Sequence, residues 1–415
     1  MLNEFIQHST FQSLVMRNFL FIGLTILSCF ANAQAYKKLH NKATLVDTHN
    51  DVMTSLTLEG RNIANRLSEG HSDLYRFKEG GVDVQFFSIW TSEKARNKEG
   101  FYKDALQEID SLQAIAQRSA DRMILATNYE QVKKGIKQHK LVALIGVEGG
   151  HMIENDIQKL DDLFIRGMRY MTLTWNNSTT WASSAKDETS PAALQNSGVL
   201  NNTIFKGLTD FGRQIVRRMN ELGVIVDLSH AGEKTFYDAI ATSSKPVLLS
   251  HSSVYSICPH FRNVKDVQIK AVAKNRGVIC INFFPGFISR EFNERFTYLT
   301  ETNGQTIRDS IKRIYMDSLL IQNKWEEYLK SSLEDFRPTL AQVVDHIDYI
   351  VKLVGDDYVG IGSDFDGISY TPKGLEDVTT FPSLTEELIR RGYSKKSIKK
   401  ILGKNVLRVM KANFK

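Results

Sequence analysis

Eight short apolar runs, rich in β-branched residues, recur along the chain and alternate with amphipathic helical patterns. Most of these runs are nearly continuous in apolar character, as expected for strands that are buried on both faces. One unbroken series of strands and helices favours a closed (β/α)₈ barrel of the TIM type. A doubly wound open sheet is the alternative, although no glycine-rich fingerprint follows the first run. The runs are 43–51, 82–90, 141–148, 168–175, 224–230, 246–252, 278–284 and 359–364.

Two segments exceed what a minimal barrel needs. Residues 181–203 are rich in Ser, Thr, Asn and Ala and predict a long loop after the fourth run. Residues 289–337 lie between the seventh and eighth runs and show helical periodicity at 307–320 and 325–336, which predicts a helical insertion. The pattern leaves open whether this insertion caps a site or carries a subunit interface, such as that of a homodimer. We expect residues 34–415 to form a single barrel domain.

The first 33 residues predict a cleaved export signal. The apolar run at 19–30 is too short to span a bilayer comfortably, and the small-x-small pattern after it ends at Ala33. We therefore expect a periplasmic or extracellular protein without a transmembrane span in its mature chain. Translation from Met16 is an alternative, because the segment before it is long and polar for a signal. Attachment of a lipid at Cys29 is a second alternative.

Composition excludes several classes of protein. A hydrophobic content of 42% and a charged content of 24% are those of an ordinary soluble domain, not of a disordered or fibrous chain. The net charge of +6 arises from basic residues interleaved with acidic ones, so we expect no nucleic-acid partner. The basic residues of 394–415 alternate with apolar ones at helical spacing, which predicts a packed terminal helix. After the signal only Cys258 and Cys280 remain, and their spacing does not show whether they pair.

The first run ends in a His-x-Asp motif formed by His49 and Asp51. Residues two apart on an extended strand point to the same face, so the imidazole and the carboxylate would project together. This pair of ligands suits a divalent ion such as zinc or manganese. The motif alone is weak, because such pairs arise by chance and often bind the backbone of a turn.

Four more candidate ligands or acids end other runs: Glu148, His230, His251 and Asp364. The carboxyl ends of parallel strands converge on one face of a barrel, so these side chains would meet His49 there. Taken singly, each has an ordinary explanation as a core histidine, a helix cap or a turn residue. Together, buried carboxylates without cations would cost several kcal/mol each. Two divalent ions held about 3.5–4 Å apart by a bridging carboxylate would neutralise them.

The order of these motifs resembles that of the renal (membrane) dipeptidases, which are binuclear zinc metallopeptidases with a barrel of the metal-dependent, amidohydrolase-like type. The resemblance extends over about residues 43–410. It rests on the segments 47–51, 146–151, 169–174, 227–230, 250–253, 262–264, 362–367 and 403–409.

The resemblance implies a set of metal ligands. His49 and Asp51 would hold one zinc ion, His230 and His251 the other, and Glu148 would bridge the two. Mn²⁺ or Co²⁺ are alternatives, because the ligand types alone do not distinguish these metals.

The resemblance also implies hydrolysis of dipeptides, including those with a D-residue at the second position. A water bridging the metals would attack the amide carbonyl, and Asp364 would pass a proton to the leaving amine. Arg262 would pair with the terminal carboxylate of the substrate through its planar guanidinium, which favours short peptides. The alternative for Arg262 is a surface ion pair with Asp266 or another acid.

One position departs from the family pattern. A histidine usually follows the fourth strand, where it polarises the scissile carbonyl, but this chain has Trp175. Tryptophan offers one N–H and cannot be cationic, so Asn176 or Asn177 would supply the donor, or the metals would act alone. We take Trp175 and Asn176 as candidate substrate contacts. The departure leaves two alternatives open: a metallohydrolase for another amide, a cyclic imide or a lactone, and an inactive zinc-binding exported protein.

Four other histidines have simpler interpretations. His151 is expected to orient Glu148 or a neighbour, and His346 to pack within a helix. His71 and His260 lie in predicted loops, where contact with a substrate is an open alternative.

Overall fold

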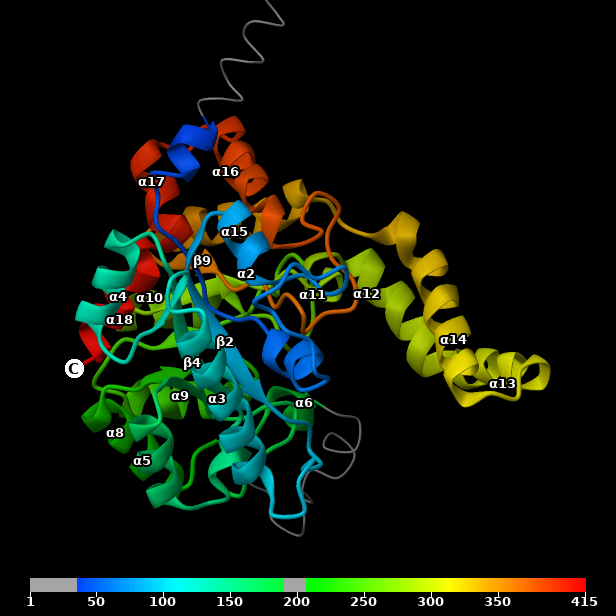
Figure 1. Cartoon of the computed structure of the whole chain (residues 1–415), viewed down its shortest axis with the longest axis horizontal. Coiled ribbons are helices and arrows are strands. Elements are labelled where there is room, and N and C mark those ends of the chain that lie inside the picture. Colours follow the sequence, from blue (N-terminus) through cyan, green and yellow to red (C-terminus); the bar gives the residue numbers. More distant parts are fainter. Residues whose placement is uncertain (1–35, 190–206) are drawn as a thin grey trace, which may run out of the picture.

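The structure is a computed structural model that describes residues 36–189 and 207–415. Eight parallel strands form a closed barrel with helices around it (Figure 1). The ring closes because β2, at the start of the strand order, pairs with β4 as well as with β1, which excludes the open sheet. The barrel strands are β1 (Leu45–Asp47), β2 (Val82–Trp90), β4 (Leu141–Glu148), β5 (Met168–Thr172), β6 (Ile225–Asp227), β7 (Leu248–Leu249), β8 (Val278–Ile281) and β9 (Val359–Ile361). Each lies within one of the eight predicted runs, so the (β/α)₈ prediction is confirmed.

The strands differ from the prediction in two ways. A ninth strand, β3 (Met123–Leu125), pairs with the amino-terminal part of β4, and its three residues were too few to stand out in the sequence. In addition, β1, β6, β7 and β9 end two or three residues before the predicted ligand or acid. The regular pairing between strands stops there. Isolated backbone hydrogen bonds join the segments beyond, such as that from the Asp364 N–H to the His49 carbonyl at 3.2 Å.

Amphipathic helices cover the outside of the barrel. Local signals set their ends: Thr209 caps the start of α8, and α8 stops at Gly223, whose φ of 88° suits glycine. The predicted helices at 102–119, 205–222 and 340–354 correspond to α3, α8 and α15. The covering helices include α2 (Leu74–Glu79), α3 (Phe101–Arg118), α4 (Tyr129–Lys137), α5 (Ile157–Ile165), α8 (Asp210–Leu222), α9 (Glu233–Thr242), α10 (Asp266–Asn275), α15 (Leu340–Val354) and α16 (Phe381–Arg390).

The predicted insertion at 289–337 is helical. Its first part, α12 (Arg290–Thr297) with the π-helical turn Tyr298–Thr302, follows the short helix α11 (Pro285–Ile288) and stays close to the barrel. Its second part, α13 (Gly304–Ile314) and α14 (Ser318–Leu333), projects away from the body at the right of Figure 1. The two parts therefore have different surroundings, and only the first lies near the open end of the barrel.

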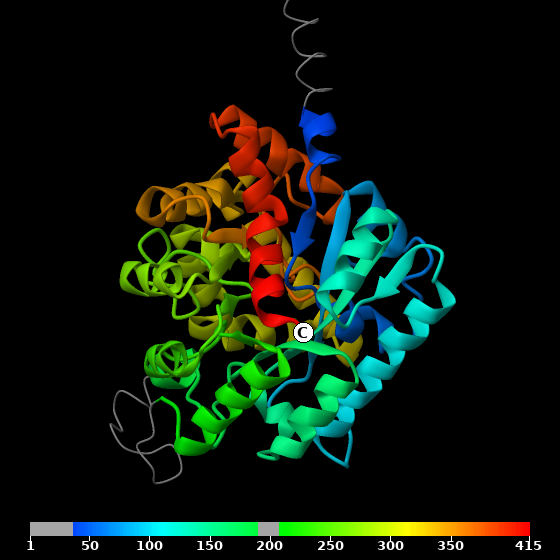
Figure 2. The same ribbon diagram turned by 90° about the vertical axis from the view of Figure 1, so that its left-hand side faces the viewer.

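The carboxyl-terminal segment closes the opposite end. It forms α17 (Lys395–Lys399), a π-helical turn (Lys400–Lys404) and α18 (Asn405–Asn413), and α18 lies across the barrel in Figure 2. Val406, Val409 and Met410 are fully buried in one cluster with interior strand residues such as Val46 and Val278. The predicted packing of this helix is thus confirmed, and the carboxyl ends of the strands form the accessible mouth.

Several predictions concern parts of the chain outside the described residues. These are the export signal at 1–33, lipid attachment at Cys29 and most of the loop at 181–203. Within the described residues, no helix is both long and apolar enough to cross a membrane. Cys258 and Cys280 are both buried free thiols.

The role of α18 can be tested with Met410→Ala. Removal of this fully buried side chain leaves a cavity at the closed end, so the free energy of unfolding should fall by about 2–5 kcal/mol. Lys411→Ala, at the exposed neighbouring position, is the matched control and should change it by less than about 0.5 kcal/mol. Guanidinium unfolding measures both, and equal effects would show that α18 does not close the barrel.

Candidate metal centre

The mouth of the barrel brings the six predicted side chains together. His49, His251 and Glu148 are at most 4% exposed, and the three lie at or just beyond the ends of β1, β7 and β4. His230 and Asp364 have φ values of 65° and 64°, a left-handed conformation that is uncommon outside glycine. These two sharp turns follow β6 and β9. The five segments thus place all candidate ligands in one buried group.

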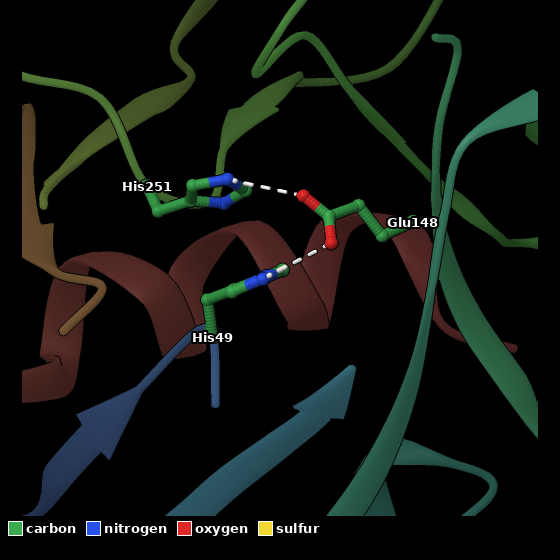
Figure 3. Close-up of side chains that lie close together, drawn as sticks. All are labelled: His49, Glu148 and His251. Atoms are coloured by element: carbon green, nitrogen blue, oxygen red, sulfur yellow. Dashed lines mark ion pairs between the residues drawn. The ribbon is translucent and has the colours of Figure 1, made fainter. Parts of the chain in front are cut away.

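Glu148 lies at the centre of this group. Its Oε1 atom is 3.0 Å from Nε2 of His230 and 3.3 Å from Nε2 of His251. Its Oε2 atom faces the other way and is 3.5 Å from Nε2 of His49. Figure 3 shows the carboxylate beside the rings of His49 and His251, with one oxygen directed at each ring. Each oxygen therefore faces a different set of imidazoles, which is the arrangement that a bridging carboxylate needs.

A second set of atoms lies on the His49 side. Nε2 of His49 is 3.2 Å from Asp51 Oδ2 and 3.9 Å from Asp364 Oδ1. The ligand atoms of these three residues all lie within 4.8 Å of one another, as do those of His49, Glu148 and His251. A Cβ at Gly367 would come within 2.2 Å of Asp51 Oδ2 and 2.5 Å of Asp364 Oδ1, so this tight turn requires glycine.

Hydrogen bonds fix which nitrogen of each imidazole faces the centre. The Tyr170 hydroxyl donates to the Thr48 carbonyl at 3.2 Å, so it accepts from Nδ1 of His49 at 2.9 Å. Nδ1 of His230 lies 2.9 Å from the side-chain oxygen of Asn176, to which it donates. Both rings therefore carry a proton on Nδ1, and Nε2 is the atom that faces Glu148.

A chain of two hydrogen bonds, from Asp227 through Ser250, places the proton of His251 on Nδ1. The Ser250 hydroxyl donates to Asp227 Oδ2 at 2.7 Å, and the same oxygen is 2.8 Å from Nδ1 of His251. Because its own hydrogen is already used, Ser250 accepts from Nδ1–H. Thr172 also donates to this Asp227 oxygen, at 2.6 Å, which holds the carboxylate in place.

Hydrogen-bond acceptors consequently face one another on the His230 and His251 side of the centre. Nε2 of His230 and Nε2 of His251 are 3.1 Å apart, and both face Glu148 oxygens without a proton between them. Nε2 of His49 and Oδ1 of Asp51 are buried and have no hydrogen-bond partner among the described residues. Buried lone pairs in this arrangement repel one another and lose their hydration. Divalent cations bound by nitrogen and oxygen ligands remove both costs, so the residues fit a metal centre.

The two central carboxyls have opposite proton affinities. Burial would raise the pKa of Glu148, but the positive charge of His49 is the main factor that holds it well below its usual value. The pKa of His49 is itself raised well above its usual value by Tyr170, Asp51 and Glu148, against the effect of burial. Burial raises the pKa of Asp364 well above its usual value, and repulsion from Asp51 and Glu148 adds to this effect. Pairs of carboxyl groups separated in this way are typical of sites where one acid carries protons.

Asp364 is also held in position from the neighbouring strand. The Asn282 side-chain amide donates to Asp364 Oδ2 at 2.8 Å, which leaves Oδ1 facing His49. Asn282 directly follows β8 and is fully buried. The orientation of Asp364 is therefore fixed independently of the ligands.

Arg262 is buried at the edge of the same mouth. Its Nη2 donates to the His251 carbonyl at 3.1 Å, and Nε has no hydrogen-bond partner among the described residues. Burial lowers the pKa of Arg262 to about 10, so the guanidinium stays charged at neutral pH. The alternative of a surface ion pair is wrong, because Asp266 instead accepts from Tyr349 at 3.0 Å and Arg262 is only 4% exposed.

A cavity of about 570 Å³ opens over these residues. Trp175 lines it, with its ring 5.1 Å from that of Trp90 and 6.2 Å from that of His230. Asn176 lines it as well, and its oxygen holds His230. The buried side-chain oxygen of Asn177 has no hydrogen-bond partner in the described part of the chain. The cavity thus exposes the central carboxylates and Arg262 to one ligand-sized space.

Three histidines outside the candidate ligand set, His151, His346 and His71, have hydrogen-bond partners in the backbone. His151 was expected to orient Glu148 or a neighbour, and its Nε2 lies 3.2 Å from the Thr91 carbonyl. His346 is buried within α15, and its Nε2 donates to the Ile288 carbonyl at 3.0 Å, in agreement with a packing role. His71 accepts from the Asp366 N–H at 2.8 Å.

Sequence reasoning missed four residues that hold the ligands: Tyr170, Asp227, Ser250 and Asn282. Asp227 and Ser250 stand within the Asp-Leu-Ser-His and Ser-His-Ser motifs, so their neighbours gave a usable signal. Tyr170, on β5, stands within the segment 169–174 that carries part of the resemblance, whereas Asn282, directly after β8, lies in none of those segments.

Comparisons with known proteins agree with this geometry. The family model for membrane dipeptidases (peptidase family M19) matches residues 33–414. The probable dipeptidase PvdM from Pseudomonas aeruginosa is 24% identical, with a TM-score of 0.75 over 92% of this chain and 98% of that one. A metallopeptidase from Rhodobacter sphaeroides, liganded with a phosphinate mimic of the dipeptide L-Ala-D-Ala, is 22% identical, with a TM-score of 0.70 and coverages of 90% and 99%.

An amidohydrolase from Pseudomonas aeruginosa is 21% identical, with a TM-score of 0.67 over 91% of this chain and 99% of that one. At these identities the solved structures show that the barrel fold is shared. The family match itself extends over nearly the whole chain, from the residue before the barrel domain to the last helix. The chain therefore belongs to the membrane dipeptidase family of metallopeptidases.

Proposed function

We propose that this protein is an exported metallodipeptidase that binds two divalent cations and hydrolyses the amide bond of small dipeptides. The observation that carries this proposal is the Glu148 carboxylate, whose Oε1 lies next to Nε2 of His230 and His251 and whose Oε2 lies next to Nε2 of His49. His49 and Asp51 would hold one cation and His230 and His251 the other, with Glu148 between them. Zinc fits these ligands, and Mn²⁺ or Co²⁺ would use the same set. When bound, such cations polarise a carbonyl and lower the pKa of water.

Asp364 and Arg262 account for the remaining chemistry. Asp364 has a raised pKa and an oxygen directed at the centre, so it can take a proton from water and deliver it to the leaving amine. Arg262 lies in the same cavity with a buried charge and an unpartnered Nε–H, which suits the free carboxylate of a dipeptide. A free carboxylate one residue from the scissile bond exists only at the carboxyl end of a peptide, so Arg262 would confine cleavage to the last amide bond.

Trp175 favours a second candidate function. Its ring stands in the mouth where other family members have a histidine, so the oxyanion would depend on the cations or on an Asn176 or Asn177 donor. A hydrolase for another amide, a cyclic imide or a lactone would keep the same metal centre. A panel of dipeptides, N-acyl amino acids and lactones separates these two functions, because turnover should be confined to the dipeptides.

Glu148→Gln tests the bridging role. A neutral amide cannot neutralise and bridge two cations, so metal content should fall from about two ions per chain, with loss of dipeptide hydrolysis. Elemental analysis of the purified protein measures the ions. Glu130→Gln is the control, since Glu130 lies on the surface in a pair with Lys133 and should keep both properties. Full metal retention by Glu148→Gln would contradict the proposal.

Asp364→Asn tests proton transfer. The amide keeps the shape of the carboxyl but carries no transferable proton, so kcat should fall by about 10²- to 10⁴-fold. Metal content, measured on the same sample, should stay close to that of the unmodified protein and so controls for loss of the centre. An unchanged kcat would show that Asp364 is not the proton carrier. Tight metal binding with no activity in any variant would favour the inactive zinc-binding protein.

Arg262→Leu tests recognition of the terminal carboxylate. The unmodified enzyme should cleave a free dipeptide about 10- to 100-fold better than the same dipeptide with an amidated carboxyl end, because the charged hydrogen bonds are lost in the amide. This preference, measured as a ratio of kcat/KM, should disappear in Arg262→Leu. If the variant retains the preference, another group binds the carboxylate.

A further inference from the structure

Four phenylalanines line the mouth cavity on the side of Arg262. We call Phe261, Phe284, Phe287 and Phe296 the aromatic wall; each is partly exposed and each borders the cavity. The rings of Phe284 and Phe287 are 4.9 Å apart, and those of Phe284 and Phe296 are 5.7 Å apart. The guanidinium carbon of Arg262 lies 5.5 Å from the Phe287 ring centre. The wall therefore begins at Arg262 and extends away from it.

The group that joins this wall to Arg262 is uncharged. The ring of His260 lies 4.3 Å from that of Phe261 and 4.6 Å from that of Phe287. Its Nδ1 accepts from the Arg262 backbone N–H at 3.1 Å, and burial lowers the pKa of His260 to about 3. A neutral imidazole between two phenylalanines extends the apolar surface beside the guanidinium.

The insertion contributes one part of the wall. Phe296 lies on α12, where its ring stacks on that of Phe292 at 6.1 Å and an angle of 12°. Phe292 is fully buried, 5.9 Å from Tyr370, and does not border the cavity. Phe292 thus fixes α12 to the body while Phe296 faces the mouth. This arrangement makes the first part of the insertion a roof of the site.

A carboxylate on Arg262 would fix where the neighbouring side chain goes. In a dipeptide, the Cα of the second residue is one bond from the terminal carboxylate, about 1.5 Å away. Its side chain must therefore start within a few ångströms of the guanidinium, where His260 and the aromatic wall are the neighbours. Glu301, which follows on the π-helical turn after α12, borders the same cavity with a negative charge.

From this geometry we infer that the aromatic wall binds the side chain of the second residue of the dipeptide and selects bulky apolar side chains over small or acidic ones. The inference rests on the proposed dipeptidase function and adds its substrate class. Contact with four phenyl rings removes a large apolar side chain from water. An acidic side chain would lose hydration against these rings, and Glu301 would repel it.

The test compares kcat/KM for glycyl-phenylalanine, glycyl-leucine, glycyl-alanine and glycyl-aspartate with the metal-loaded enzyme. Glycyl-phenylalanine and glycyl-leucine should be cleaved about tenfold or more better than the other two. Phe284→Ala should lower kcat/KM for glycyl-phenylalanine about tenfold and leave glycyl-alanine within about twofold. Phe284→Leu should restore most of the loss, since it replaces part of the apolar surface.

Trp325→Leu is the matched control in the same apolar cluster. Trp325 lies on α14, is buried and does not border the cavity, and its ring contacts Tyr328 and Arg308, so the variant should leave the ratio between the two substrates unchanged. Equal losses for both substrates in Phe284→Ala would show that the wall acts only through stability and would overturn the inference. Equal cleavage of all four dipeptides by the unmodified enzyme would overturn it while leaving the dipeptidase function standing. Absence of any dipeptide turnover would overturn both this inference and the proposed dipeptidase function.

Discussion

The structure depends on one electrostatic constraint: the buried Glu148 carboxylate faces the Nε2 atoms of three imidazoles. The tautomer of each ring is set from behind, by Tyr170 for His49, by Asn176 for His230 and by Ser250 for His251. These partners hold all three Nε2 atoms towards Glu148. Burial lowers the pKa of His230 and of His251, so these two rings stay neutral and their Nε2 lone pairs are free to bind a cation.

The barrel gives this centre its position as well as its rigidity. The terminal helix α18 closes one end with fully buried side chains, so ligands approach from the carboxyl ends of the strands. Strands β1, β6, β7 and β9 end before their functional residues, which leaves short extensions free to turn. Left-handed turns at His230 and Asp364 use that freedom to direct both side chains inwards. The paired strands thus stabilise the fold, and the irregular backbone that follows them positions the candidate ligands.

The two halves of the cavity differ in chemical character. The side of Asp51 and Glu148 is rich in acceptors and suits cations, whereas the side of Arg262 combines one buried positive charge with aromatic rings. A dipeptide has the complementary pattern, with an amide to be cleaved next to a carboxylate and a variable side chain. The proposed metal ligands match the family that the sequence resembles, whereas Trp175 departs from it and Phe296 comes from the insertion.

The sequence by itself determined the eight barrel strands and the helical nature of the insertion, because both follow from local apolar periodicity. It also determined the order of the six central side chains, because these stand in short motifs at the ends of the apolar runs. It could not determine where the strands end, that β3 exists, or which groups orient the ligands. Those features depend on contacts between distant segments, as between His49 and Tyr170, which are 121 residues apart. Only the closed barrel determines these features, because it brings side chains from segments far apart in the sequence into contact.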